Sequence, residues 1–213
     1  MTVREILPIA APLDVSVKIP GSKSITNRAL VCAALAKGES VIRNASDSDD
    51  TALMTNGLNQ LGVLVRKNAD ALIVEGTGGT LYAPKFPIPV GNAGTTLRFL
   101  LSLAALAQGK TVIETNSRMA ERPNDDLLNA LAQLGVKAQQ VGSRFSVGSP
   151  SDMAQGGTLR GGRAKLDAQK SSQFLSSLLL TAPYASSDIA IQLEGRLSSA
   201  SYIDMTMDVM KQF

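Results

Sequence analysis

The chain has 213 residues, enough for one large domain or two small ones, and 44% of them are apolar, which is ample for a core. The net charge is only +3, the basic residues are scattered, and aromatic residues make up 4% with no Trp, so we expect no nucleic-acid-binding surface. There is no histidine, which excludes Ser-His-Asp and Cys-His catalytic groups and the usual zinc sites. Acid–base chemistry would therefore fall to Lys, Asp, Glu or Tyr.

The single cysteine, Cys32, lies on the apolar face of a predicted helix, which favours a structural thiol over a reactive one. One cysteine can form no internal disulfide and is typical of a reducing compartment. The sequence contains no apolar run long enough to span a bilayer and no basic-then-apolar leader. We expect a soluble, cytoplasmic protein with no membrane partner.

Residues 1–19 are predicted to form an extended lead-in, in which residues 14–18 alternate like a strand. The segment 20–28 (PGSKSITNR) follows, with small residues around Lys23, and it predicts a tight loop that opens an amphipathic helix over 25–37. Such a helix N-terminus carries unpaired N–H groups and a partial positive charge, to which Lys23 and Arg28 add two full charges. The segment favours a phosphate or carboxylate ligand. A simple helix cap with two solvated basic residues is the alternative, and the spacing is not that of a P-loop.

Further elements follow from the periodicity and from the Gly and Pro positions. In the first part, the helix ending at Gly38 is followed by a strand over 40–43, a helix over 49–61, and strands over 63–66 and 71–75. In the second part, residues 91–96 open a helix that runs to Gly109, followed by a strand over 111–114, a helix over 123–134, and strands over 136–141 and 144–147. In the third part, residues 170–173 open a helix through Leu180, followed by a strand over 188–193 and a helix from Tyr202 to the last residue.

These parts recur at a nearly fixed spacing. Arg28 and Arg98 are 70 residues apart, Arg98 and Gln173 are 75 apart, and the Leu-Gly breaks at Gly62 and Gly135 are 73 apart. We predict a mixed α/β fold built from a pseudo-threefold repeat, with units over about 20–90, 91–165 and 166–213. Chance similarity of short α/β segments is the alternative. The third unit ends before its final strand pair, so we expect a fragment or one part of a longer polypeptide.

All three units open their first helix with small polar residues, at 21–24, 91–95 and 171–173. Pseudo-threefold packing would bring these helix N-termini to one end of the domain, where each favours an anion by roughly 0.3–1 kcal/mol. The arrangement suits a small, multiply anionic ligand. Capping alone would explain any one of the three.

Three further clusters are candidates for binding. Residues 118–123 (RMAERP) precede a predicted helix with Pro123 at its first position, where Arg122 could grip a carboxylate or phosphate in bidentate fashion; a surface Arg-Glu pair is the alternative. Asp47, Asp49 and Asp50 resemble a metal cluster, but capping of the helix that begins there is favoured. At the start of the last helix the candidate ligand hydroxyls, with capping as the rival role, are Ser198, Ser199 and Tyr202.

These segments together resemble the 5-enolpyruvylshikimate-3-phosphate synthases of the shikimate pathway to aromatic amino acids. The resemblance runs from about residue 8 to the C-terminus and covers about half the length of a family member. It rests on PGSKSITNRAL (20–30), GNAGTTLRFL (91–100), RMAERP (118–123), SSQFLSSLLLTAP (171–183) and SYIDMTMDVM (201–210).

The resemblance implies the two-domain enolpyruvyl transferase fold, each domain made of three βαβαββ units, with substrates in the cleft between the domains. Residues 20–213 would form the N-terminal domain with its third unit incomplete, and residues 1–19 would pack with the absent C-terminal half. The implied reaction transfers the enolpyruvyl group of phosphoenolpyruvate to the 5-hydroxyl of shikimate 3-phosphate and releases phosphate. It passes through addition and elimination, without a metal or organic cofactor.

The resemblance also implies roles for individual residues. Lys23 and Arg122 would be catalytic, and Lys23 would contact both substrates and neutralise charge in the transition state. The residues implied for shikimate 3-phosphate are Lys23, Ser24, Arg28, Ser171, Ser172, Gln173, Ser199 and Tyr202. The residues implied for phosphoenolpyruvate are Lys23, Asn92, Gly94, Arg122 and Gln173.

Two departures from the family limit what is implied. Some family members have proline at the position of Phe99. Because of this difference, the resemblance does not imply sensitivity to the inhibitor glyphosate. The family's proton-transferring Asp and Glu, and its further Lys and Arg ligands, lie in the absent half, so no general base is identified in this chain.

Two alternatives stay open at this point. One is the related transferase that acts on UDP-N-acetylglucosamine, although its members carry a loop cysteine and Cys32 lies in a predicted helix. The other is a non-catalytic anion-binding half-domain. For these 213 residues alone we expect ligand binding without turnover.

Overall fold

Helix α1 (Lys23–Leu35) is the most deeply packed helix of the first part of the chain. Every residue from Thr26 to Leu35 is buried, and the helix contacts β3 (Ala71–Thr77), α2 (Asp49–Gln60) and α7 (Ser201–Met210). A helix that is covered on all sides needs apolar residues all round, which is what the sequence supplies after Arg28. The Ser22 hydroxyl caps its first turn by accepting a hydrogen bond from the N–H of Ile25 (3.4 Å).

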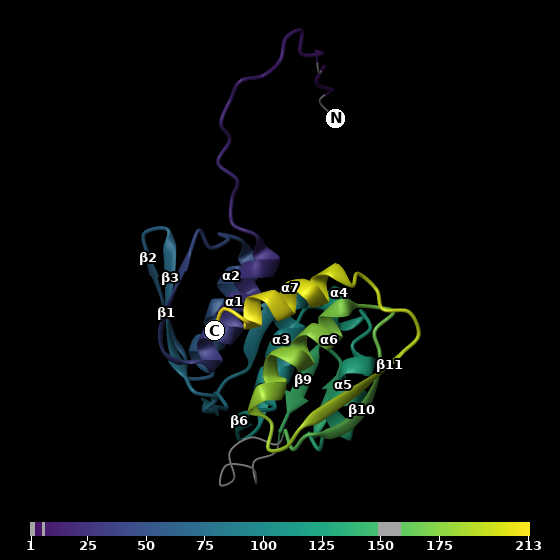
Figure 1. Ribbon diagram of the computed structural model, residues 1–213. Helices are drawn as coiled ribbons and strands as arrows, with labels where there is room; N and C mark the ends of the chain where they lie inside the picture. The colour runs from purple at the N-terminus through teal and green to yellow at the C-terminus, as the bar shows by residue number, and fades with distance from the viewer. Residues whose placement is uncertain (1–2, 6, 149–158) are drawn as a thin grey trace.

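The computed structural model describes residues 3–5, 7–148 and 159–213. It confirms the mixed α/β fold (Figure 1). The first part adds β1 (Lys37–Arg43) and β2 (Leu64–Asn68) to the elements named above. The second part contains β4 (Leu81–Tyr82), β5 (Ile88–Gly91), α3 (Gly94–Ala104), β6 (Ala107–Gln108), β7 (Thr111–Thr115), α4 (Ser117–Ala120), α5 (Asp125–Gln133), β8 (Ala138–Val141) and β9 (Arg144–Val147). The third part contains β10 (Gly162–Asp167), α6 (Ser172–Thr181), the 3₁₀ turn η2 (Ala182–Tyr184) and β11 (Ile189–Glu194) before α7.

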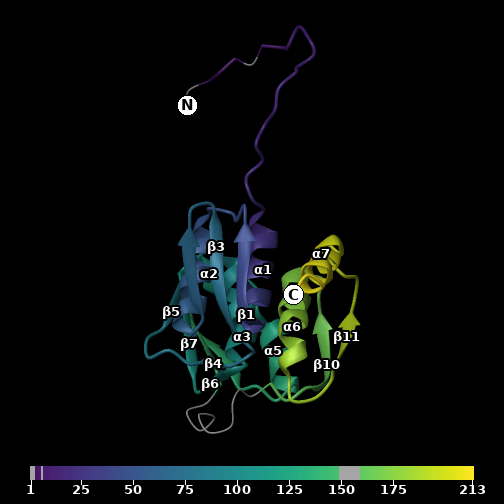
Figure 2. The same cartoon turned by 60° about the vertical axis from the view of Figure 1, so that its left-hand side comes forward.

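The strands form separate small sheets. An antiparallel sheet has the order β1-β3-β2, and a four-stranded sheet has the order β5-β7-β9-β8. Strands β10 and β11 pair in parallel, with Asp167 opposite Glu194 at their carboxyl ends. The sheet of β1, β2 and β3 lies on one side of the molecule and the β10–β11 pair on the other, with α1 and α6 between them (Figure 2).

The order β1-β3-β2 matches the order β7-β9-β8, with antiparallel pairing in both. The threefold relation of whole units, and the division into residues 1–19 and 20–213, stay predictions. Residues 149–158 of the second predicted unit, and residues 1, 2 and 6 of the lead-in, lie outside the described residues.

The predicted strand at 14–18 is wrong for this structure. Residues 7–22 contain no helix or strand, and the segment extends away from the body of the molecule (Figures 1 and 2). Its apolar side chains, such as Val15 and Val17, are 66–74% exposed. A strand needs a neighbour to pair its N–H and C=O groups, and within the described residues this segment has none.

Several element boundaries also differ from prediction. Helix α1 ends at Leu35 rather than near Gly38, because β1 begins at Lys37. Helix α3 ends at Ala104, and residues 107–108 pair with β4 instead of continuing the helix. Helix α5 begins at Asp125, so Pro123 is not its first residue. Helix α7 ends at Met210, three residues before the end of the chain.

None of the helices in residues 3–5, 7–148 and 159–213 is both long and apolar enough to cross a bilayer.

The C-terminal end of α1 is fixed by the end of β3. The N–H of Gly78 donates to the carbonyl of Ala36 (2.8 Å), and the Thr77 hydroxyl donates to the carbonyl of Ala34 (3.1 Å). Gly76 makes this approach possible, because a Cβ there would lie 2.3 Å from the carbonyl oxygen of Ala36. The position of α1, and so of Lys23 at its other end, depends on this contact.

We predict that Gly76→Ala lowers the free energy of unfolding by about 3 kcal/mol, because the methyl group meets backbone that must shift. Gly38→Ala is the matched control, since Gly38 has a φ of +87° but open space around it. It should cost only about 1 kcal/mol of backbone strain. Urea denaturation measures the free energy of unfolding of both variants, and we expect the slope of this free energy against urea concentration to stay unchanged. Equal transition midpoints for the two variants would contradict the prediction.

Candidate functional site

The first turns of four helices surround one cavity of about 370 Å³. Helices α1, α3, α6 and α7, or the residues just before them, supply its lining. The residues that line it are Lys23, Ser24, Arg28, Thr95, Lys170, Ser171, Ser172, Gln173, Ser198, Ser199 and Tyr202. The prediction that the N-termini of α1, α3 and α6 lie at one end of the molecule is therefore confirmed, while their relation by a repeat stays a prediction. All eight residues that the sequence assigned to shikimate 3-phosphate lie on this cavity.

Arg28 lies beneath the cavity and joins three helices. It is only 1% exposed, and it donates to the carbonyl of Ser24 (2.9 Å) in α1, to Ser176 Oγ (3.1 Å) in α6 and to Thr206 Oγ1 (2.7 Å) in α7. A longer bond reaches the carbonyl of Tyr202 (3.4 Å). Burial lowers the pKa of Arg28. Buried charge of this kind requires such hydrogen bonds, and they make Arg28 a structural tie as well as part of the lining.

Two aromatic rings flank the same guanidinium. Its carbon lies 5.3 Å from the ring centre of Phe99 and 5.6 Å from that of Tyr202. Both distances suit cation–π attraction. Phe99 therefore links α3 to Arg28, a contact that a proline at this position could not make.

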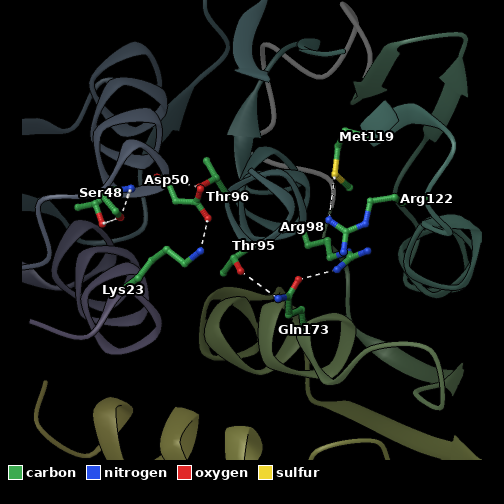
Figure 3. Close-up of polar contacts among 10 residues, drawn as sticks. Lys23, Ser48, Asp50, Thr95, Thr96, Arg98, Met119, Arg122 and Gln173 are labelled. Carbon is green, nitrogen blue, oxygen red and sulfur yellow. Dashed lines mark hydrogen bonds and ion pairs between the residues drawn. The ribbon is translucent and has the colours of Figure 1, made fainter. Parts of the chain in front are cut away.

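Arg98 plays the corresponding part between α3 and the start of α6 (Figure 3). It donates to Gln173 Oε1 (2.6 Å), Ser171 Oγ (3.3 Å), Asn124 Oδ1 (3.2 Å) and the carbonyl of Pro123 (3.3 Å). The amide nitrogen of Gln173 in turn donates to Thr95 Oγ1 (2.9 Å). Gln173 is thus held at both ends of its amide and presented to the cavity.

The pKa of Arg98 falls to about 10, chiefly because the group is buried and secondly because Arg122 repels it. The guanidinium still carries its charge at neutral pH. It lies 4.9 Å from the ring centre of Phe174.

Lys23 forms an ion pair with Asp50 (2.9 Å), the second residue of α2. The main-chain carbonyl of Asp50 accepts a hydrogen bond from the buried hydroxyl of Thr96 (2.9 Å), which ties this turn to α3. The side chain of Lys23 is 48% exposed, so the pair is worth only about 0.2–1 kcal/mol. An anion in the cavity could therefore compete with Asp50 for Lys23.

The residues assigned to phosphoenolpyruvate are only partly brought together. Gly94, the first residue of α3, faces Arg122, since a Cβ on Gly94 would lie 3.1 Å from Arg122 Nη1. Arg122 Nη1 also lies 3.8 Å from Met119 Sδ (Figure 3). Lys23 and Gln173 line the 370 Å³ cavity, whereas Asn92, Gly94 and Arg122 do not.

The sequence predicted that Pro123, as the first residue of the helix, would place Arg122. This prediction is wrong, because α5 begins at Asp125. Instead Asn124, the residue before α5, donates from its side-chain amide to the carbonyl of Arg122 (2.9 Å) and accepts from Arg98. The backbone before α5 is thus fixed by a tertiary contact.

Comparison with known proteins shows to which family the chain belongs. The family model described as EPSP synthase (3-phosphoshikimate 1-carboxyvinyltransferase) matches residues 8–213. The chain belongs to the EPSP synthase family. The 3-phosphoshikimate 1-carboxyvinyltransferase of Trichormus variabilis is 41% identical over 204 residues, which are 95% of this chain and 47% of that protein.

Solved structures agree on the fold. Two structures of EPSP synthase from Acinetobacter baumannii superpose with TM-scores of 0.74 and 0.72 at 21% and 20% identity. Each match covers 86% of this chain and 41% of the solved chain. The chain spans about half the length of these EPSP synthases.

Capping and site formation coincide at the start of α6. Ser171 is the N-cap of α6, and its hydroxyl accepts from the N–H of Gln173 (3.2 Å) while it lines the cavity. Asp49 and Asp50 lie in the first turn of α2, which Ser48 caps by accepting from the N–H of Thr51. Among the candidate hydroxyls Ser198, Ser199 and Tyr202, Ser199 has a φ of +53°, a strained value for a residue other than glycine.

Cys32 is buried, and burial raises the pKa of its thiol to about 12. The thiol stays protonated at neutral pH, in agreement with a structural role.

A larger cavity of about 600 Å³ lies elsewhere, between α2 and the turn that joins β2 to β3. The one basic residue of its lining, Lys67, pairs with Asp47 (3.0 Å), and none of the five segments that carry the family resemblance contributes to it. The smaller cavity, with its convergent basic and hydroxyl groups, is the better candidate for an anion.

Sequence reasoning missed the roles of three residues. Arg98 served only as a marker of the repeat, although its spacing from Arg28 could have indicated a matching buried guanidinium. The sequence indicates Thr95 and Lys170 only as parts of the openings of two helices. Their roles depend on contacts across 78 and 44 residues, to Gln173 and Asp126 respectively, which a local pattern does not reveal.

We predict that Arg98→Met lowers the free energy of unfolding by about 2–4 kcal/mol, because it leaves the acceptors on Gln173, Asn124 and Pro123 unpaired. Arg66→Met is the control: Arg66 is a half-exposed arginine that pairs with Glu75 (2.7 Å) and should cost less than about 1 kcal/mol. Urea unfolding of both variants tests this, and equal losses would contradict it.

Proposed function

We propose that this chain is the N-terminal half of an enzyme that transfers the enolpyruvyl group of phosphoenolpyruvate to the 5-hydroxyl of shikimate 3-phosphate, with release of phosphate. The observation that carries the proposal is the gathering of all eight residues assigned to shikimate 3-phosphate on one cavity of about 370 Å³. Its volume lies within the range of small-ligand sites. The relative from Trichormus variabilis carries the name of this activity.

The charge of the lining fits two polyanionic substrates. Lys23 and Lys170 are half-exposed cations, and the serine hydroxyls and the helix N-termini add donors. In the proposed reaction Lys23 contacts both substrates and stabilises the negative charge that develops in the transition state. Arg122 and Asn92 hold phosphoenolpyruvate beside Gly94, and Gln173 lies along the shikimate ring.

The same lining supports binding without turnover in the isolated chain. Addition of the 5-hydroxyl across the double bond of phosphoenolpyruvate needs a group that accepts the hydroxyl proton and one that protonates carbon. Among the described residues, the cavity lining includes no carboxylate and no tyrosine other than Tyr202. Asp50 and Asp126 form ion pairs with Lys23 and Lys170 of the lining. We infer that the proton-transfer groups belong to a second half.

The chain alone is therefore expected to bind shikimate 3-phosphate and to release no phosphate when phosphoenolpyruvate is added. Calorimetric titration measures the first and a phosphate assay the second. Ser199→Ala should weaken binding by about tenfold, whereas Ser186→Ala, outside the cavity, should change it less than about twofold. A wild-type chain that does not bind shikimate 3-phosphate would contradict the proposal. Sustained phosphate release by the chain alone would refute the assignment of proton transfer to a second half.

Gly94→Ala tests the phosphoenolpyruvate side of the proposal. The added methyl group would lie against Arg122 and narrow the space beyond phosphoenolpyruvate. In the chain combined with its second half, the glyphosate concentration for half-inhibition should rise about tenfold or more, with a smaller change in the KM for phosphoenolpyruvate. Gly142→Ala, which has open space around it, is the control. Unchanged glyphosate inhibition in Gly94→Ala would show that this glycine does not border the inhibitor.

A further inference from the structure

A second lysine lies on the candidate site. Lys170 lines the 370 Å³ cavity together with Ser171, Ser172 and Ser199. It immediately precedes Ser171, the N-cap of α6. None of the roles carried over from the family includes it.

The fold places Lys170 opposite the serines of the last helix. Strands β10 and β11 are parallel neighbours, so the loops that follow them leave the same edge of the sheet. Lys170 lies in the loop after β10, and Ser198 and Ser199 lie in the loop after β11. The N–H of Ser198 donates to the carbonyl of Ala168 (3.3 Å), which holds the two loops together.

The ammonium group of Lys170 is engaged by an acid on a third element. Its Nζ lies 2.8 Å from Asp126 Oδ2, in the first turn of α5, and the lysine side chain is 48% exposed. The hydrogen bond that Lys170 donates to Asp126 raises the pKa of Lys170, so the group is charged at neutral pH. The lysine end of this pair is open to solvent, and a phosphate dianion offers strong, charge-assisted hydrogen bonds in exchange.

Lys170 and Lys23 have matching environments. Each lysine lines the cavity at the start of a helix, and each pairs with the second residue of another helix, Asp126 in α5 and Asp50 in α2. Both lysines are 48% exposed, whereas Asp50 is 24% and Asp126 18% exposed. Each lysine can therefore turn from its aspartate to an anion in the cavity, and the aspartate that it leaves keeps partial contact with water.

We propose that Lys170 is a ligand of the phosphate group of the substrate, which it reaches by exchanging Asp126 for the phosphate beside Ser171 and Ser172. The proposal rests on the function proposed above, because it takes shikimate 3-phosphate as the ligand of this cavity. The competing role is structural: the ion pair would only fasten α5 to α6.

The test compares variants of the 213-residue chain by calorimetric titration with shikimate 3-phosphate and with unphosphorylated shikimate. Lys170→Gln should weaken binding of shikimate 3-phosphate about tenfold and leave binding of shikimate unchanged. Lys170→Arg should restore most of the affinity. Lys67→Gln is the matched control, because it also removes an exposed Lys–Asp pair (3.0 Å) but lies outside this cavity.

Asp126→Asn separates the two roles. If Lys170 is a phosphate ligand, removing its competitor should tighten binding of shikimate 3-phosphate by about two- to threefold. The affinity of Lys170→Gln should also fall less steeply with added salt than that of the wild-type chain, since one cation fewer meets the anion.

Two results would overturn the proposal while the function stands: equal affinities of Lys170→Gln and Lys67→Gln, or a loss of affinity in Asp126→Asn as large as in Lys170→Gln. A wild-type chain that binds neither shikimate 3-phosphate nor inorganic phosphate would overturn the proposed function together with it.

Discussion

Two buried guanidinium groups hold the candidate site together. Arg28 in α1 and Arg98 in α3 both extend to α6, the first to Ser176 and the second to Ser171 and Gln173. Among the described residues, neither guanidinium forms an ion pair, and neutral acceptors and aromatic faces satisfy them instead. Since burial weakens screening, these two charges leave the α6 N-terminus positive. The anion binding that we propose for the cavity would follow from this unneutralised charge.

Arg28 and Arg98 fix the positions of other site residues as well as the electrostatic potential of the cavity. Arg28 ties the first turn of α7 to α1 and α6, so the backbone of Tyr202 can hardly move without breaking partly buried hydrogen bonds to its carbonyl. Arg98 holds the amide oxygen of Gln173, and Thr95 accepts from its nitrogen, which leaves that side chain one orientation. A site whose residues are held in this way loses little conformational entropy when a ligand binds.

The sequence predicted the parts of this design that are local. The polar openings of α1, α3 and α6 and the alternating strands follow from short patterns and lie close to where we expected them. For α2 the acidic first turn was expected, but the cap is Ser48 and not one of the aspartates. Strand β10 was missed because it pairs in parallel with β11, 27 residues away, and no turn signal marks such a pairing. The start of α5 was misplaced because Asn124, besides its local bond to the carbonyl of Arg122, is fixed by Arg98 on α3, a contact that no local pattern reveals.

The prediction for residues 14–18 failed for the opposite reason. Alternation of Val15, Val17 and Ile19 is a true strand pattern, but a strand forms only against a partner, and the described residues offer none to this segment. A local pattern states what a segment can do, and the tertiary neighbours decide whether it does so. The same applies to Lys170, whose role the sequence around it could not indicate.

The two lysines on the cavity form weak ion pairs, whereas the two buried arginines form strong hydrogen bonds, and the two kinds of residue have different roles in the site. The buried guanidinium groups are held by bonds that cost about 1–3 kcal/mol each to leave unmade, so they stay in place whether or not a ligand is present. The ion pairs Lys23–Asp50 and Lys170–Asp126 have half-exposed lysines, and water at the lysine end weakens each pair. A phosphate that forms charged hydrogen bonds of about 1.5–3 kcal/mol each can therefore replace the aspartate that pairs with a lysine. It cannot replace the buried acceptors that hold an arginine. The arginines provide a fixed positive frame, and the lysines are the groups free to respond to the anion that enters it.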